Sequence, residues 1–306
     1  MVSDSTSGAK LLPSDVATIG ILVIVTSTLL IASIGQASLL GWTLLHAAMT
    51  VGFGLLLLFM SRAEGSRWVD YTRPAVTVAV MVTLYFTLGH VVFEAIPWSA
   101  DRLLDGVDTV LFLGRNPALV VSQWATPVRV EFFSVFYAAF IPYVHLSLLL
   151  GCLGRPRRER DIFLTAYALL YAWSFLGYLA LPARGPIVFL ADAFAAPIEG
   201  GFVHSLVVGT IDAGGGPHGA FPSLHVGASM LFCLFDLRYN VLRGLLSVPF
   251  VGMIMLATVV LRYHYVIDLV AGFALALGAI SLAHCQGCVQ CGTVQGRKEG
   301  AAALSS

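Results

Sequence analysis

The chain has 306 residues, of which 58% are hydrophobic and only 11% are charged, and its mean hydropathy is +0.87. Because about a quarter of the residues in soluble domains are charged, this composition excludes an ordinary soluble domain and indicates an integral membrane protein. The 17 basic and 17 acidic residues cancel to a formal net charge of zero, which gives no reason to expect a nucleic-acid partner.

The apolar residues gather into eight runs, several of which reach the roughly 20 residues that a helix needs to cross a hydrocarbon core about 30 Å thick. In chain order the runs are 16–35, 39–60, 74–96, 130–153, 162–181, 222–237, 244–261 and 264–283. We therefore expect an all-α integral membrane protein with about eight transmembrane helices. The first run could also be a cleaved signal peptide, but it exceeds the usual length of about 7 to 15 residues and no A-x-A site follows it, which favours an anchor.

The basic residues lie unequally on the two sides of the membrane if the eight runs alternate in direction. Five of the 17 fall on the side opposite the N-terminus, and the other twelve share the N-terminal side. The five are Arg102, Arg115, Arg129, Arg184 and Arg262. Because cytoplasmic loops are enriched in Lys and Arg, we expect both termini in the cytoplasm. The other helix ends would then face the outside of a plasma (bacterial inner) membrane or the lumen of a Golgi-like membrane.

The first long outer segment contains DRLLDGVDTVLFLGRNP, in which apolar residues recur at helical spacing. The apolar stripe consists of Leu103, Leu104, Val107, Val110 and Leu111. The charged residues fall mostly elsewhere on the helix: Asp101, Arg102, Asp105 and Asp108. This pattern predicts a helix lying at the membrane interface, as either a connector or a lid over a substrate.

Two polar blocks interrupt the second half of the sequence: DAGGGPHGAFPSLHVGAS at 212–229 and RYHYVIDLVAG at 262–272. In the second block, His264 and Asp268 are four residues apart and share one face of a helix. A carboxylate that accepts the proton of one imidazole nitrogen fixes the tautomer and leaves a lone pair on the other nitrogen. His264 is therefore a candidate nucleophile with Asp268 as its orienting partner, although such a pair alone is more often structural.

In the first block, His225 stands at the start of a helix that runs inward from the outer face. Helix N-termini bind phosphate groups, and glycines such as Gly216 allow a close backbone approach. Arg184, in LPARGPIV, and Arg262 lie on the same face and could bind phosphate oxygens. With His225 protonating the leaving oxygen, the set predicts phosphoryl transfer through a phosphohistidine at His264, with no metal ion or organic cofactor.

The blocks FPSLHVGAS and YHYVIDLVAG, with PARGP upstream, together resemble the type 2 phosphatidic acid phosphatase (PAP2) superfamily. Within it the inositol phosphorylceramide synthase branch is most similar, because those synthases carry a PSLH block and an HHY-x-x-D-type block. The resemblance is strong over residues 177–273 and extends to residues 97–142.

The resemblance implies a role for each motif residue. In the superfamily the second histidine attacks phosphorus, the aspartate orients that histidine, and the first histidine acts as acid and base. Here these residues are His264, Asp268 and His225. Arg184 would match the phosphate-binding arginine of the first motif, and Ser223 the serine of the second. The chain has PSLH in place of PSGH and lacks the lysine of the first motif, which weakens the assignment as a simple phosphatase.

These inferences predict a membrane enzyme that transfers a phosphoryl or phospho-alcohol group from a lipid donor to a lipid alcohol such as ceramide. Two alternatives stay open: hydrolysis of phosphatidic acid or another lipid phosphate, and non-catalytic binding or transport of a lipid phosphate. Membrane lipids are the expected partners in each case. We expect two accessory helices in residues 1–73, a catalytic domain of six helices in 74–284, and a cytoplasmic tail in 285–306.

The tail places Cys285, Cys288 and Cys291 at C-x2-C-x2-C spacing, which suits zinc or an iron–sulfur cluster. A fourth ligand is missing unless His284 serves, and its adjacency to Cys285 makes that geometry strained. A lipidated or simply reduced tail is therefore favoured over a metal site.

Overall fold

A computed structural model describes residues 11–63, 66–153 and 155–303, with side chains up to residue 286. The protein is 81% helical, and the described residues contain no strand. The helices are α1 (Pro13–Gly35), η1 (Ala37–Leu39), α2 (Leu40–Arg62), α3 (Arg67–Ala95), α4 (Asp101–Leu111), α5 (Pro117–Ser122), α6 (Pro127–Cys152), α7 (Arg157–Ala180), α8 (Pro186–Phe189), η2 (Ala191–Ala193), α9 (Phe202–Ala213), α10 (Leu224–Tyr239), α11 (Val241–Val260) and α12 (Val266–Ala303). The predicted all-α fold is confirmed.

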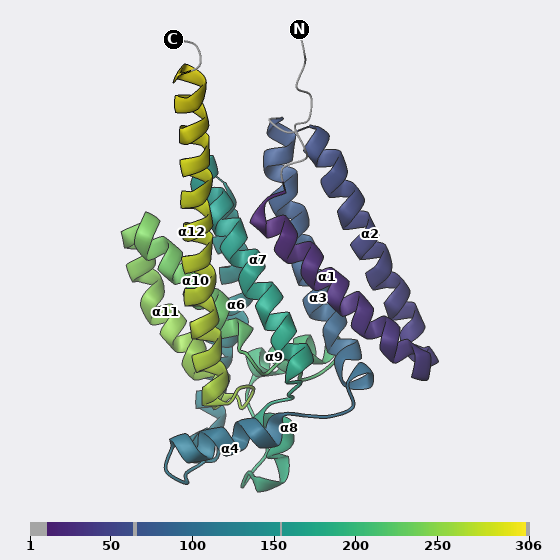
Figure 1. Ribbon diagram of the computed structural model, residues 1–306. Coiled ribbons are helices and arrows are strands. Elements are labelled where there is room, and N and C mark those ends of the chain that lie inside the picture. The colour runs from purple at the N-terminus through teal and green to yellow at the C-terminus, as the bar shows by residue number, and fades with distance from the viewer. Residues whose placement is uncertain (1–10, 64–65, 154, 304–306) are drawn as a thin grey trace.

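Seven helices in the described part of the chain are long and apolar enough to cross a membrane, as expected of an integral membrane protein. They are α1, α2 with η1, α3, α6, α7, α11 and the first 21 residues of α12. The run at 222–237 corresponds to α10, which has only 16 residues and packs among α6, α7, α11 and α12. Both chain ends lie at one end of the bundle, with α4 and α8 at the other (Figure 1). This placement agrees with a chain that crosses the membrane an even number of times.

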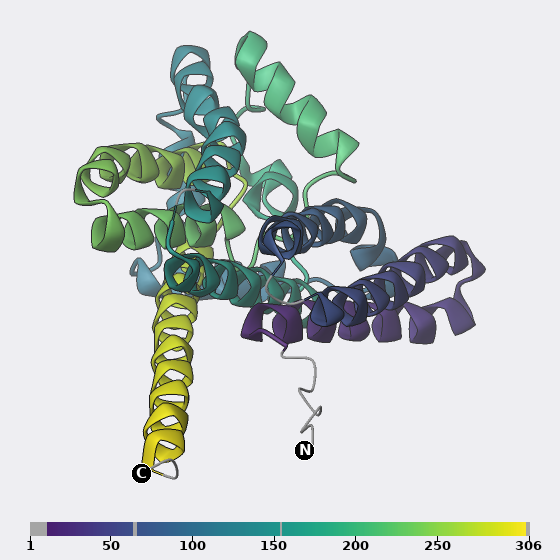
Figure 2. The same cartoon turned by 90° about the horizontal axis from the view of Figure 1, so that it is seen from above.

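The centre of the bundle is α7. In its most apolar window 72% of the residues are buried, against 22% to 44% in the other six candidate spans. Its aromatic side chains Tyr167 and Phe175 are fully enclosed by protein. The hairpin of α1 and α2 stands at the edge of the bundle, with α1 packed against α7 and α3 (Figure 2).

The close contact between α10 and α12 depends on a residue without a side chain. A Cβ atom at Gly272 would lie 2.3 Å from the carbonyl oxygen of Ser223, so only glycine permits this approach. The backbone N–H of Ser223 then donates to the carbonyl of Asp268 at 3.0 Å. As a result the beginnings of α10 and α12, which carry the two polar blocks, lie side by side.

The helix predicted in the first outer segment forms as α4, but its acidic face is buried and much of its apolar face is exposed. The apolar residues Leu103 and Val110 are 57% and 76% exposed, whereas Asp101 and Asp108 are each 2% exposed. The acidic face of α4 therefore points into the protein, and much of its apolar stripe points outward.

Candidate active site

His264 lies in the short loop between α11 and α12, with its ring held by a backbone carbonyl. Its Nδ1 atom lies 2.8 Å from the oxygen of Ala220 and 3.5 Å from Oδ2 of Asp268. A carbonyl oxygen can only accept a hydrogen bond, so Nδ1 carries the proton and Nε2 keeps the lone pair. The sequence predicted that Asp268 would accept the proton of one imidazole nitrogen, without indicating which one. In the structure Nδ1 donates to the carbonyl oxygen of Ala220, and the carboxyl group of Asp268 lies farther away.

Asp268 is itself held in place by the start of α12. Its Oδ2 atom accepts the backbone N–H of Tyr265 at 2.8 Å, and its side chain is fully buried. The carboxylate thus connects the histidine loop to the first turn of the helix.

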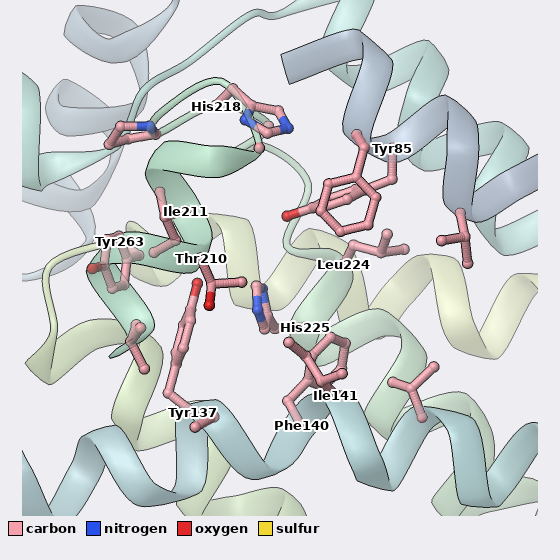
Figure 3. Close-up of a pocket in the computed structure, with 18 of the residues that line it drawn as sticks. Tyr85, Tyr137, Phe140, Ile141, Thr210, Ile211, His218, Leu224, His225 and Tyr263 are labelled. Atoms are coloured by element: carbon pink, nitrogen blue, oxygen red, sulfur yellow. The ribbon is translucent and has the colours of Figure 1, made fainter. Parts of the chain in front are cut away.

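His225 lies in the first turn of α10 and faces His264, with 5.6 Å between the ring centroids. Its ring packs against two aromatic rings of α6, Tyr137 at 4.5 Å and Phe140 at 4.4 Å. Figure 3 shows His225 directed into the cavity beside these two side chains. The two imidazoles are therefore close enough to act on one phosphoryl group.

Arg184 is exposed and belongs to the lining of the same cavity as both histidines. Its guanidinium carbon lies 4.2 Å from the ring centroid of Phe93 on α3. The next residue, Gly185, has a φ of +87°, and a Cβ there would lie 2.2 Å from the carbonyl oxygen of Tyr263. The loop of Arg184 therefore packs directly against the loop of His264, and this close approach requires glycine at position 185.

Two carboxylates of α4, which sequence reasoning did not assign to the site, hold these loops. Asp101 accepts the backbone N–H groups of Arg184 at 2.9 Å and Gly185 at 2.8 Å. Asp108 accepts those of Val266 at 2.7 Å and Ile267 at 2.9 Å, at the start of α12. The only signal in the sequence was that both acids share one face of α4 with Leu104.

The remaining predicted phosphate ligands divide into one residue inside the cavity and two outside it. Gly216 lines the cavity with a φ of +83°. The Oγ of Ser223 caps α10 at 3.4 Å from the N–H of Val226, and the residue is fully buried. Ser223 is thus placed as a helix cap.

Arg262 points away from the cavity. Its Nη1 atom donates to the carbonyl oxygen of Ala196 at 3.0 Å, and its guanidinium carbon lies 3.9 Å from the ring centroid of Phe194. The backbone of Arg262 has a φ of +64°, which turns the chain between α11 and the histidine loop. Of the two arginines predicted to bind phosphate, only Arg184 lies beside the histidines.

The cavity has a volume of about 400 Å³ and is walled by side chains of α3, α6, α7 and α9. Along α6 its lining runs from Tyr137 to His145, a rise of about 12 Å. No carboxylate lines it among the residues that the structure describes. Apart from Arg184 and the histidines, its walls are mainly aromatic and aliphatic.

His218 lies at the rim of the cavity near Tyr85 (Figure 3). Its Nδ1 atom donates to the carbonyl oxygen of Gly216 at 2.8 Å, which leaves the lone pair on Nε2. Burial lowers the pKa of His218, so this imidazole stays neutral near pH 7.

The cysteine motif of the tail falls outside this site. Cys285 is exposed near the middle of α12, at the end of the apolar span of this helix, and the side chains of Cys288 and Cys291 lie outside the described residues.

Comparison with protein families gives one match, to the PAP2 superfamily over residues 102–282, which is more than half of the chain. The matched region begins at α4 and includes Arg184, His225, His264 and Asp268. It leaves out α1 to α3. Comparisons with curated proteins and with solved structures gave no significant match.

Proposed function

Since the chain belongs to the PAP2 superfamily, whose members are lipid enzymes of the phosphatase or phosphotransferase type, we propose that it is a transferase acting through a phosphohistidine. The donor is a membrane phospholipid, and the acceptor is a lipid alcohol of the ceramide kind, as in the inositol phosphorylceramide synthases. Residues 74–284 form the catalytic domain, α1 and α2 are accessory, and the site opens to the outer or lumenal face.

In the first half-reaction, Nε2 of His264 attacks the phosphorus atom of the donor. A nitrogen–phosphorus bond forms while the bond from phosphorus to the diacylglycerol oxygen breaks. His225, protonated when the anionic phosphate of the donor lies beside it, gives its proton to that oxygen, and diacylglycerol leaves as an alcohol. Arg184 lies where it can neutralise the charge on the phosphoryl oxygens.

In the second half-reaction, the acceptor hydroxyl replaces the histidine on phosphorus. His225, now neutral, takes the proton of that hydroxyl as its oxygen bonds to phosphorus. The nitrogen–phosphorus bond breaks and returns its electron pair to Nε2 of His264. Both histidines end the cycle in their starting protonation states.

The observation that carries this proposal is the hydrogen bond from Nδ1 of His264 to the carbonyl oxygen of Ala220. It leaves Nε2 unprotonated, in a cavity that also contains His225 and Arg184. A non-catalytic binder would gain nothing from a fixed, unprotonated imidazole beside a second histidine.

Two features of the cavity support a lipid acceptor and a donor without a cationic headgroup. The lining extends about 12 Å along α6 between apolar walls, which suits the chains of a lipid alcohol better than water alone. The described lining offers no carboxylate to pair with an ammonium group, which favours an inositol-type headgroup over choline or ethanolamine.

The test is a product assay on the purified protein in mixed micelles containing EDTA. Phosphatidylinositol and phosphatidic acid, each labelled in the phosphate, are supplied with and without ceramide. The proposal predicts a ceramide-dependent labelled phospholipid from phosphatidylinositol, which disappears in His264→Ala. EDTA should leave the rate unchanged, because no step uses a metal ion.

Other products would identify the alternatives. Phosphate released from phosphatidic acid, independent of ceramide, would make the protein a lipid phosphatase. Lipid binding that survives both His225→Ala and His264→Ala, with no product from either donor, would make it a binder or transporter.

A further inference from the structure

The helix α4 touches both loops that carry the reacting groups. Asp101 binds the backbone of Arg184 and Gly185, and its Oδ1 also accepts the hydroxyl of Tyr265 at 3.0 Å. Asp108 binds the first N–H groups of α12, two residues after His264. In each carboxylate, both oxygen atoms accept a backbone N–H.

These two carboxylates are buried without a basic partner among the described side chains. A buried carboxylate is costly unless hydrogen bonds replace its lost hydration. Here backbone N–H groups supply two hydrogen bonds to each carboxylate, and the hydroxyls of Ser99 and Tyr265 add to those of Asp101. Each carboxylate therefore fixes the position of a backbone segment. Among the residues that the structure describes, none from α4 lines the cavity.

The spacing of the two acids gives α4 its geometric role. Asp101 and Asp108 are seven residues apart on one helix, a separation of about 10.5 Å along its axis. The loops they hold come from positions 184–185 and 265–267, far apart in the sequence. A single rigid helix therefore sets the distance between the phosphate-binding cation and the nucleophile.

We propose that Asp101 and Asp108 are positioning residues that align Arg184 with His264 on one phosphoryl group. This inference rests on the proposed phosphohistidine function. A misplacement of about 1 Å at a reacting centre can cost about 100-fold in rate. The effect should fall on the chemical step, because neither acid contacts the cavity.

The test compares Asp101→Asn and Asp108→Asn with Asp105→Asn. An asparagine offers one acceptor oxygen where the carboxylate offers two, so each test variant must lose a loop contact. Asp105 lies between them on α4 but accepts from the side chain of Asn116, not from either loop. Tyr265→Phe is a further variant, which removes the hydroxyl donor to Asp101 and keeps the shape of the buried ring.

The readouts are kcat, KM and the pre-steady-state rate of phosphoenzyme formation from phosphatidylinositol labelled in the phosphate, with the melting temperature measured in the same micelles. We expect kcat and the phosphoenzyme rate to fall about 10- to 100-fold in Asp101→Asn and Asp108→Asn. The KM of both test variants should stay within about threefold of the wild type. Asp105→Asn should match the wild type in all three quantities, and the kcat of Tyr265→Phe should lie between that of the wild type and that of Asp101→Asn.

A double-mutant cycle separates positioning from general structural support. If Asp101 acts through Arg184, the effect of Asp101→Asn on kcat should shrink to less than about threefold when Arg184 is already alanine. A merely structural role would lower the melting temperature and leave kcat per folded molecule unchanged.

Two results overturn the inference while leaving the proposed function intact. One is a phosphoenzyme rate in both test variants equal to that of Asp105→Asn, with His264→Ala inactive. The other is full additivity of Asp101→Asn and Arg184→Ala. By contrast, unchanged activity in His264→Ala would overturn the proposed function itself.

Discussion

The two ends of the helical bundle use buried charge in opposite ways. At the end that holds both termini, acidic and basic side chains pair directly. Arg155 lies 3.3 Å from Asp236, which also pairs with Arg243, and Arg160 lies 3.2 Å from Asp70.

At the site end, carboxylates and cationic groups are kept apart. Asp101 and Asp108 bind backbone N–H groups, and Arg184 rests on the ring of Phe93. A cation already paired with a carboxylate would bind a phosphate weakly. The first end pairs its charges with one another, whereas the second leaves Arg184 without a carboxylate partner among the described side chains, as the proposed phosphate binding requires.

The largest expected effect that tests this contrast is the loss of either histidine. We expect His264→Ala and His225→Ala to lower turnover at least about 1,000-fold, because each removes a group that forms or breaks a bond. His284→Ala, near the middle of α12 and outside the cavity lining, should retain normal turnover. The measurement is product formation from labelled phosphatidylinositol, and more than a tenth of wild-type activity in either site variant would contradict the assignment.

Asp236→Ala, at the end of the bundle that holds both termini, should cost a comparable free energy, but as lost folding stability and not as lost turnover. This change leaves the guanidinium groups of Arg155 and Arg243 without their shared carboxylate, and breaking a buried pair costs about 3–5 kcal/mol. Turnover per folded molecule should not change. The matched control is Asp70→Ala, whose side chain is 29% exposed and whose loss should cost about 1 kcal/mol or less. Unfolding in detergent micelles measures both, and equal costs would contradict the distinction.

An intermediate effect should separate the two arginines at the site end. Arg184→Ala should lower kcat/KM about 10- to 100-fold, because hydrogen bonds to a charged group contribute about 1.5–3 kcal/mol. Arg262→Ala should instead lower the melting temperature, since it removes the contacts with Ala196 and Phe194. The measurement is kcat/KM of both variants with phosphatidylinositol. A larger loss of kcat/KM in Arg262→Ala than in Arg184→Ala would reverse the roles of the two arginines.

The smallest effect should be a pH dependence carried by His218. Burial holds its pKa below the ordinary value of 6.5, so the folded protein favours the neutral form. The unfolded chain takes up a proton first as the pH falls below 6.5, and the stability that neutral His218 contributes is then lost. Melting temperatures from pH 7.5 to 5 should therefore fall less in His218→Gln than in the wild type. Parallel curves would show that His218 does not carry the effect.

The apolar runs predicted the membrane class and the long helices, because the length of an apolar run is a local property and a helix of about 20 residues is what the hydrocarbon core requires. The short helices α5, α8 and α9 had no counterpart among the predictions. The run at 222–237 was the shortest predicted span, with 16 residues, and it formed a helix of the same length, α10. Ser223 caps this helix, which packs against α7, α11 and α12.

The sequence also indicated the proposed nucleophile from the four-residue spacing of His264 and Asp268. The predicted shared helix face did not form, because His264 lies in the loop before α12 and only Asp268 is on the helix. Three features follow only from the packing of distant segments: the carbonyl that fixes the tautomer, the arginine that reaches the cavity, and the inward-facing acids of α4. Each of these depends on groups that lie 44 to 159 positions apart in the chain. Hydropathy and helical periodicity describe one segment at a time, whereas such contacts exist only after the segments have packed.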